Sequence, residues 1–159
     1  MRVHARRAAS ALVVLLLVSG LCACSSSTES YCGALREDKK QLEKLAGEAS
    51  QPGSDGLGDT VSLLSGLRDE APDDIAGEWD TLVGALEELD EAIEASGADP
   101  GDFGSDQKPP GVSEGQFDAV QKAAAELGSL RVQQASKSIE QHASDVCKVD
   151  LRGGLGGAG

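Results

Sequence analysis

The most regular apolar pattern in the chain lies between residues 72 and 96, and it constrains the fold more than any other feature. Apolar side chains recur there at steps of four and three residues, at Ile75, Trp79, Leu82, Leu86, Leu89 and Ile93. This spacing places them along one face of a helix, as in the seam of a helical bundle. Pro72 is expected in the first turn, where its missing N–H costs nothing. Such a seam requires further helices to cover it.

Three other segments carry helical stripes, near 29–49, 56–70 and 113–148. Ser113 and Gln116 form a capping box at the start of the last one. The halves of that segment are out of phase around Gly128–Arg131, so a bend or a change of face is expected there. No alternating β-branched run competes with these helices. The stripes consist of Tyr31, Leu35, Leu42, Leu45 and Ala49; Leu57, Val61, Leu64 and Leu67; Phe117, Val120, Ala124 and Leu127; and Val132, Ala135, Ile139, Ala143 and Val146.

The first residues have the parts of an export signal. The basic start MRVHARR precedes AASALVVLLLVSGL, an apolar run of about 14 residues that is short for a membrane span of roughly 20. The next residues, LCAC, resemble the lipobox of bacterial lipoproteins, with Leu21 at −3, Ala23 at −1 and Cys24 as the acceptor. The resemblance implies a diacylglyceryl group, with fatty acyl chains such as palmitate, on the Cys24 thiol and cleavage before it.

Cys22 fits poorly as the acceptor, because it would place Leu21 at −1, where a small residue is required. The alternatives to a lipoprotein signal are an ordinary secretory signal and an uncleaved anchor. The lipobox ends the signal peptide, over 1–23. The rest of the chain is expected to comprise a tether over 24–28, a helical domain over 29–149 and a flexible tail over 150–159.

Two cysteines, Cys32 and Cys147, remain once Cys22 leaves with the signal and Cys24 carries lipid. Outside the cytoplasm such a pair predicts a disulfide, and the alternative is two buried free thiols. In an up-and-down bundle the start of the first helix and the end of the fourth lie at the same end. The chain is therefore expected to be all-α, an up-and-down four-helix bundle stapled by one disulfide, with a disordered tether and a disordered glycine-rich tail.

The mature chain is strongly acidic. Loss of Arg2, Arg6 and Arg7 with the signal leaves 11 basic against 27 acidic residues, a formal charge of −16. This charge repels nucleic acid and anionic lipid head groups. The negative charge either keeps the protein soluble beside a crowded cell wall or binds a cationic partner or divalent cations.

Candidate chemical motifs are sparse. Asp99, Asp102 and Asp106 in the loop 97–112 could ligate calcium, but their spacing does not match an EF-hand, and a solvated loop is the simpler interpretation. His142 lacks partners at zinc-site spacing, and no G-x-S-x-G elbow occurs. The carboxylates of Glu87, Glu88, Asp90, Glu91 and Glu94 are expected on the polar face opposite the seam. No enzyme activity, cofactor or metal site is predicted.

The whole resembles small helical lipoproteins of actinobacteria. That resemblance implies a cell-envelope address, on the extracytoplasmic face of the cell membrane, held there by the lipid on Cys24. The expected function is a non-enzymatic protein-interaction module whose partner is an envelope protein. The alternative is a carrier that binds a small ligand or a cation, in a cleft of the bundle or in the acidic loop 97–112.

Overall fold

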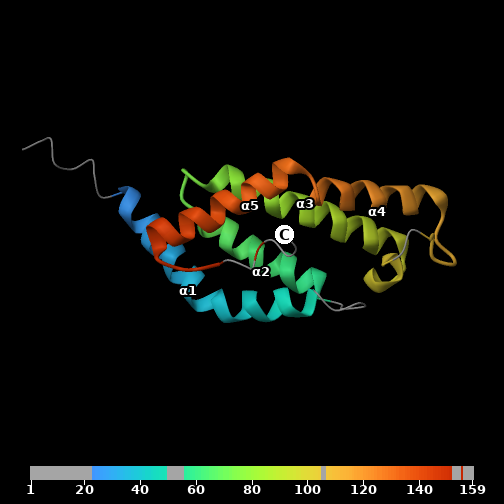
Figure 1. Ribbon diagram of the computed structural model, residues 1–159, viewed down its shortest axis with the longest axis horizontal. Coiled ribbons are helices and arrows are strands. Elements are labelled where there is room, and N and C mark those ends of the chain that lie inside the picture. The colour runs from blue at the N-terminus through green and yellow to red at the C-terminus, as the bar shows by residue number, and fades with distance from the viewer. Residues whose placement is uncertain (1–22, 50–55, 105–106, 152–154, 156–159) are drawn as a thin grey trace, which may run out of the picture.

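The computed structural model describes residues 23–49, 56–104, 107–151 and 155, and their side chains except those of 23–26, 46, 48 and 49. This part of the chain is all-α and contains no strand. It comprises five α-helices, one 3₁₀ turn and one π turn (Figure 1). In chain order they are α1 (Ala23–Ala49), α2 (Leu57–Glu70), α3 (Ala76–Ser96), η2 (Pro100–Phe103), α4 (Glu114–Leu127), α5 (Leu130–His142) and the π turn η3 (Ala143–Cys147).

The helices pack as neighbours in sequence. Helix α1 packs on α2, α2 on α3, and α3 on both α4 and α5, while η3 returns to α1. The molecule is elongated, with the start of α1 and the end of α5 at one end and η2 at the other (Figure 1). The first and last elements therefore meet at one end of the molecule, as predicted.

Helix α3 is the central element, because it has neighbours on two sides. Five of its six predicted seam residues are buried, and Leu89 is partly buried. Val83 and Ala85, which lie beside the seam, are buried as well. The helix begins at Ala76, later than predicted, because Pro72–Ile75 forms a turn in which the Ile75 N–H donates to the Pro72 carbonyl at 3.0 Å.

Helix α1 begins at Ala23, earlier than the predicted start near residue 29. It takes in the backbone of 24–28, which the sequence analysis assigned to a tether. This stretch holds no proline or glycine, and each residue added to an existing helix gains a hydrogen bond at little further cost. The four buried side chains Tyr31, Leu35, Leu42 and Leu45 confirm the predicted stripe.

The predicted fourth helix is two helices, so the prediction of four is wrong. Helix α4 ends at Leu127 with Gly128 as its C-cap, and Ser129 caps α5 through its Oγ, which accepts from the Val132 N–H at 3.3 Å. The break falls where the stripes change phase. In α4, Val120 and Ala123 are buried, whereas the predicted Ala124 is exposed. A serine at this position can start a new helix on a different axis. Its side-chain oxygen accepts the hydrogen bond of a first-turn N–H that has no carbonyl partner within the helix.

Ser113 begins α4 with the predicted capping box. Its Oγ accepts from the Gln116 N–H at 3.3 Å, and Gln116 Oε1 accepts from the Ser113 N–H at 3.0 Å. Ser113→Ala should lower the free energy of unfolding by about 1 kcal/mol in urea denaturation. Ser62→Ala, on the exposed side of α2, is the matched control and should be neutral or slightly stabilising, because alanine has the higher helix propensity. Equal losses in both variants would contradict the capping role.

The π turn η3 changes which residue faces the core at the end of α5. A π turn holds more residues than an α turn, so the phase of the stripe shifts. Cys147 is fully buried, and the predicted core residue Val146 is 46 % exposed. Lys148 ends the turn with a left-handed φ of 58°, and the Val149 N–H donates to the Ala143 carbonyl at 3.0 Å. The chain reverses at this point.

Part of the tail predicted over 150–159 packs on the domain. Leu151 is buried in the main core beside Val149, and Leu155 packs against that core. The tail residues 152–154 and 156–159 lie outside the described part of the chain. The glycine-rich composition predicted a tail that does not pack on the domain. The leucines among these glycines, however, carry apolar side chains that a nearby core can bury.

Candidate functional site

The predicted disulfide is present. Cys32 on α1 and Cys147 in η3 are bonded, with 5.0 Å between their Cα atoms and 115 residues between them in sequence. The exposed fractions of these residues are 5 % and 0 %. Arg36 Nη2 donates to the Cys147 carbonyl at 3.1 Å and ties the same two elements together. A bond this deeply buried is shielded from exchange with external thiols, so its role is structural.

Cys24, the predicted lipid acceptor, lies at the start of α1, two helical turns before Cys32. The described side chains of α1 begin at Ser27. The acyl group on Cys24 therefore stays a prediction. Its backbone position places the expected lipid at the disulfide end of the molecule (Figure 1).

The acidic loop uses its described carboxylates for local structure. Asp102 Oδ2 accepts from the Asp99 N–H at 3.3 Å, which closes the turn η2, and both residues are exposed. Asp106 lies outside the described residues. Phe103 of this turn stacks on Phe117 of α4, with ring centroids 6.3 Å apart. Across the described chain, no three His, Cys, Asp or Glu side chains gather as a metal site would require.

A buried polar cluster joins three helices beside the disulfide, and periodicity alone did not predict it. The Trp79 Nε1–H of α3 donates to Tyr31 Oη of α1 at 2.9 Å, and both residues are fully buried. His142 of α5 lies against Tyr31, with ring centroids 5.7 Å apart. Its Nε2 is 3.5 Å from Asp74 Oδ2, and its buried Nδ1 has no hydrogen-bond partner in the described structure. The only signal in the sequence was the placement of Tyr31 and Trp79 in core stripes.

Burial raises the pKa of Tyr31 from 10.0 to about 12, assisted by the negative charge of Asp74 and opposed by the hydrogen bond from Trp79. Between pH 10 and pH 12 the Tyr31 hydroxyl therefore stays protonated in the folded chain and loses its proton in the unfolded chain. Stability from this group is complete below pH 10 and falls as the pH rises toward 12, by about 2–3 kcal/mol in total.

Tyr31 is the only tyrosine of the chain, so its ionisation can be followed directly. We expect the near-ultraviolet absorbance of tyrosinate to appear with a midpoint near pH 12 in the folded protein and near pH 10 in urea. Circular dichroism over the same pH series identifies the range in which the helices persist. A midpoint near pH 10 in protein that is still helical would contradict the buried position of this phenol.

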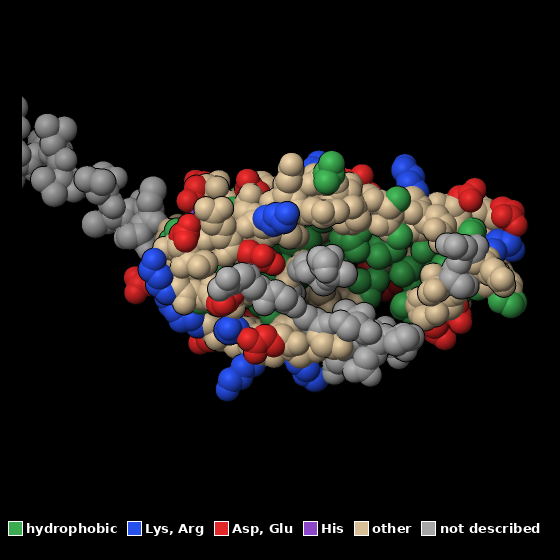
Figure 2. Space-filling view, viewed as in Figure 1, with side chains coloured by type: hydrophobic (Ala, Val, Ile, Leu, Met, Phe, Trp, Pro, Cys, Tyr) green, Lys and Arg blue, Asp and Glu red, His purple; other side chains and the backbone are tan. Residues whose placement is uncertain are grey.

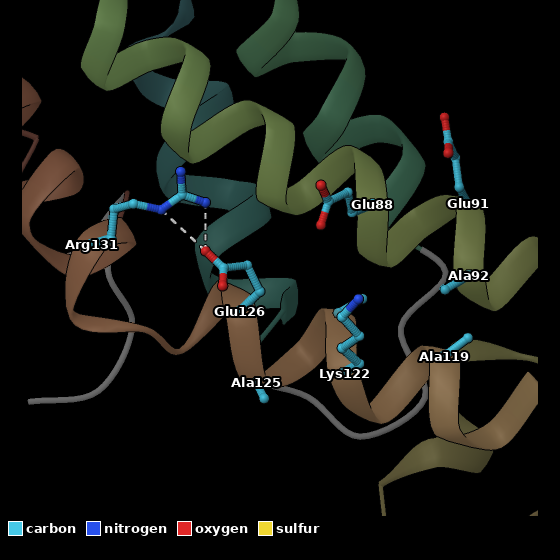
Figure 3. A pocket seen from close by; sticks show the side chains of 9 residues that line it. Glu88, Glu91, Ala92, Ala119, Lys122, Ala125, Glu126 and Arg131 are labelled. Carbon is cyan, nitrogen blue, oxygen red and sulfur yellow. Dashed lines mark hydrogen bonds and ion pairs between the residues drawn. The ribbon is translucent and has the colours of Figure 1, made fainter.

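An open groove of about 770 Å³ lies between α3 and α4 (Figure 3). Alanines line it together with Glu88 and Glu91 of α3 and Lys122 and Glu126 of α4. Arg131 at the start of α5 pairs with Glu126, with 2.6 Å between Nη2 and Oε1. Glu87, in contrast, faces α2, where it pairs with Arg68 at 3.0 Å. The carboxylates expected on one polar face thus lie on two flanks of α3.

The groove is lined by charged side chains of both signs and by alanines. The charged side chains suit a polar or charged surface contact. Among the helices described, none combines the length and apolar composition needed to cross a bilayer.

Comparison of the chain with protein-family models, with curated proteins and with solved structures gives no match. The class that the fold defines is an acidic, all-α domain closed by one buried disulfide.

Proposed function

We propose that this chain is a lipid-anchored lipoprotein of the extracytoplasmic membrane face that acts as a non-enzymatic interaction module. The observation that carries the proposal is the buried Cys32–Cys147 disulfide. Structural disulfides form and persist in oxidising compartments outside the cytoplasm. A signal with a lipobox ending at Cys24 is one route by which a chain reaches such a compartment and stays at a membrane.

The shape of the domain supports the same proposal. Cys24 lies at the end of the molecule that holds the disulfide, and η2 lies at the far end (Figure 1). Anchoring through Cys24 would present η2 and the turn into α4 away from the bilayer. Two or three acyl chains on one cysteine hold a domain durably, whereas a single chain binds a bilayer only marginally.

A partner protein of the envelope is the proposed ligand. The charged groove between α3 and α4 offers both signs of charge to such a partner, and the overall excess of carboxylates favours a partner that is basic. A carrier for an apolar molecule would require an enclosed apolar cavity, whereas this groove is open and is lined in part by charged side chains.

The lipid attachment can be tested with a matched pair of variants in bacteria that process lipoproteins. Cells expressing the full chain are fed an alkyne-labelled palmitate and then fractionated. Cys24→Ala should lose the label and leave the membrane fraction, whereas Cys22→Ala should keep both. Mass spectrometry should find a diacylated Cys24 as the mature N-terminus. Loss of label in Cys22→Ala alone, or an unmodified N-terminus at another residue, would contradict the proposal.

A further inference from the structure

Positive and negative side chains are unevenly distributed among the helices. Helix α3 contains no lysine or arginine, and its carboxylates include the exposed Glu88, Glu91 and Glu94. Figure 2 shows several Lys and Arg side chains along α1, on the side of the molecule away from α4. Within the protein, neutralisation of α3 therefore has to come from the helices that pack on it.

The charges in the groove between α3 and α4 are sorted by wall. Glu88 and Glu91, one helical turn apart on α3, line one wall, and Lys122 of α4 and Arg131 of α5 line the other (Figure 3). Glu126 also lies on the α4 wall, but Arg131 neutralises it, because Nε and Nη2 both donate to its Oε1, at 3.2 and 2.6 Å. The charges that remain are negative on the α3 wall and positive on the α4 wall.

These remaining charges have no partner in the part of the chain that the structure describes. The side chains of Glu88, Glu91 and Lys122 are exposed and form no ion pair or hydrogen bond there. Glu87, on the other flank of α3, is by contrast held by Arg68 at 3.0 Å. The flank of α3 that faces α2 is thus paired within the fold, whereas the flank that faces the groove offers its charges to another molecule.

Small side chains between the two walls define the shape of what can dock. Ala92 of α3 and Ala119 and Ala123 of α4 line the groove, so the backbone of a docked segment can approach both helices closely. A helix laid between two packed helices makes the same kind of contact as a neighbour in a bundle. An amphipathic helix in an open groove is also a common mode of recognition between proteins.

We propose that the groove between α3 and α4 binds one helix of the partner protein. That helix has basic residues one turn apart on the edge that meets Glu88 and Glu91, small residues facing the alanines, and an acidic residue on the edge that meets Lys122. The inference rests on the proposed function as an interaction module and specifies the chemistry of its partner. The two walls also fix the direction of the helix, because the opposite direction would exchange its edges and bring like charges together.

The test uses unlipidated, disulfide-bonded protein and a synthetic alanine-based helical peptide with lysines along one edge and glutamates along the other. In nuclear magnetic resonance titrations, the amide shifts should concentrate at residues 88–92 and 119–123. A control peptide of the same composition, with both charges mixed on each edge, should bind at least about fivefold more weakly. The expected size is that of a few exposed ion pairs.

Two pairs of glutamine variants separate the groove from the general acidity of the surface. Glu88→Gln with Glu91→Gln should weaken binding of the peptide by roughly fivefold. Glu29→Gln with Glu37→Gln removes the same charge from exposed positions on α1 and should leave the affinity within about twofold. Equal losses in the two pairs would mean that the peptide responds only to net charge, and this result overturns the proposal.

A second comparison tests the position of the docked helix. Ala119→Trp places a large side chain in the groove and should weaken binding at least about tenfold, whereas Ala124→Trp, at an exposed position of α4 outside the groove lining, should not. Normal binding by an Ala119→Trp variant that keeps its helical circular dichroism, or no saturable binding by the wild type, overturns the proposal. Palmitate labelling of Cys24 is unaffected by these outcomes, so the groove and the lipid anchor can fail separately.

Discussion

Replacing both Cys32 and Cys147 with alanine should lower the free energy of unfolding by about 4–5 kcal/mol. The bond links residues 115 positions apart, so its loss frees that long span of the chain in the unfolded state. Domains of this size are stable by roughly 5–15 kcal/mol, so the variant would retain a small margin. Alanine is the appropriate substitute, because serine would bring a hydroxyl into a fully buried site.

The measurement is urea denaturation followed by the fluorescence of Trp79, which is the only tryptophan. A reductant should shift the wild-type midpoint to that of the double variant and should leave the variant itself unchanged. The second condition is the control for effects of the reductant on the rest of the protein. Identical midpoints for the oxidised wild type and the variant would show that the bond adds nothing to stability.

Trp79→Ala should destabilise the domain by about 3–5 kcal/mol. The indole of α3 is fully buried in the main core, and its removal leaves a cavity there. It also removes the hydrogen bond to Tyr31 Oη and leaves that buried hydroxyl without its donor. The result should be a partly unfolded protein at moderate temperature, seen by circular dichroism because the fluorescent residue is gone.

Trp79→Phe separates the two contributions to this loss. It keeps most of the ring volume and removes the N–H, so it should cost less than Trp79→Ala, about 1–3 kcal/mol. Tyr31→Phe completes a double-mutant cycle, whose coupling energy should be about 1 kcal/mol. A Trp79→Ala variant that is within about 1 kcal/mol of the wild type would contradict the central position of this side chain.

Periodicity predicted the helices well where burial is one-sided. The stripes of α1 and α2 and the seam of α3 place the buried leucines correctly, and the cysteine positions fixed which ends of the chain meet. An apolar stripe shows which face of a helix is buried. It does not show whether the helix continues along the same axis where the stripe changes phase. The phase change at Gly128–Arg131 was therefore visible, but the restart of the helix at Ser129 depends on a side-chain cap.

Features that depend on contacts between distant residues were not predictable. The bond between Trp79 and Tyr31 joins residues 48 apart, and the position of His142 beside them depends on the packing of α5 on α3. The burial of Leu151 likewise depends on packing against core residues that are distant in sequence, which no local pattern records.

The bridge between the first and last helical elements also sets an order of events during biosynthesis. Cys147 leaves the ribosome 115 residues after Cys32, which at 5–20 residues per second corresponds to roughly 6–23 seconds. Throughout that interval the earlier thiol has no native mate and is open to mispairing with other sulfhydryl groups. Correct closure must therefore wait until all five described helices have emerged, so the bond cannot guide the folding of the first of them.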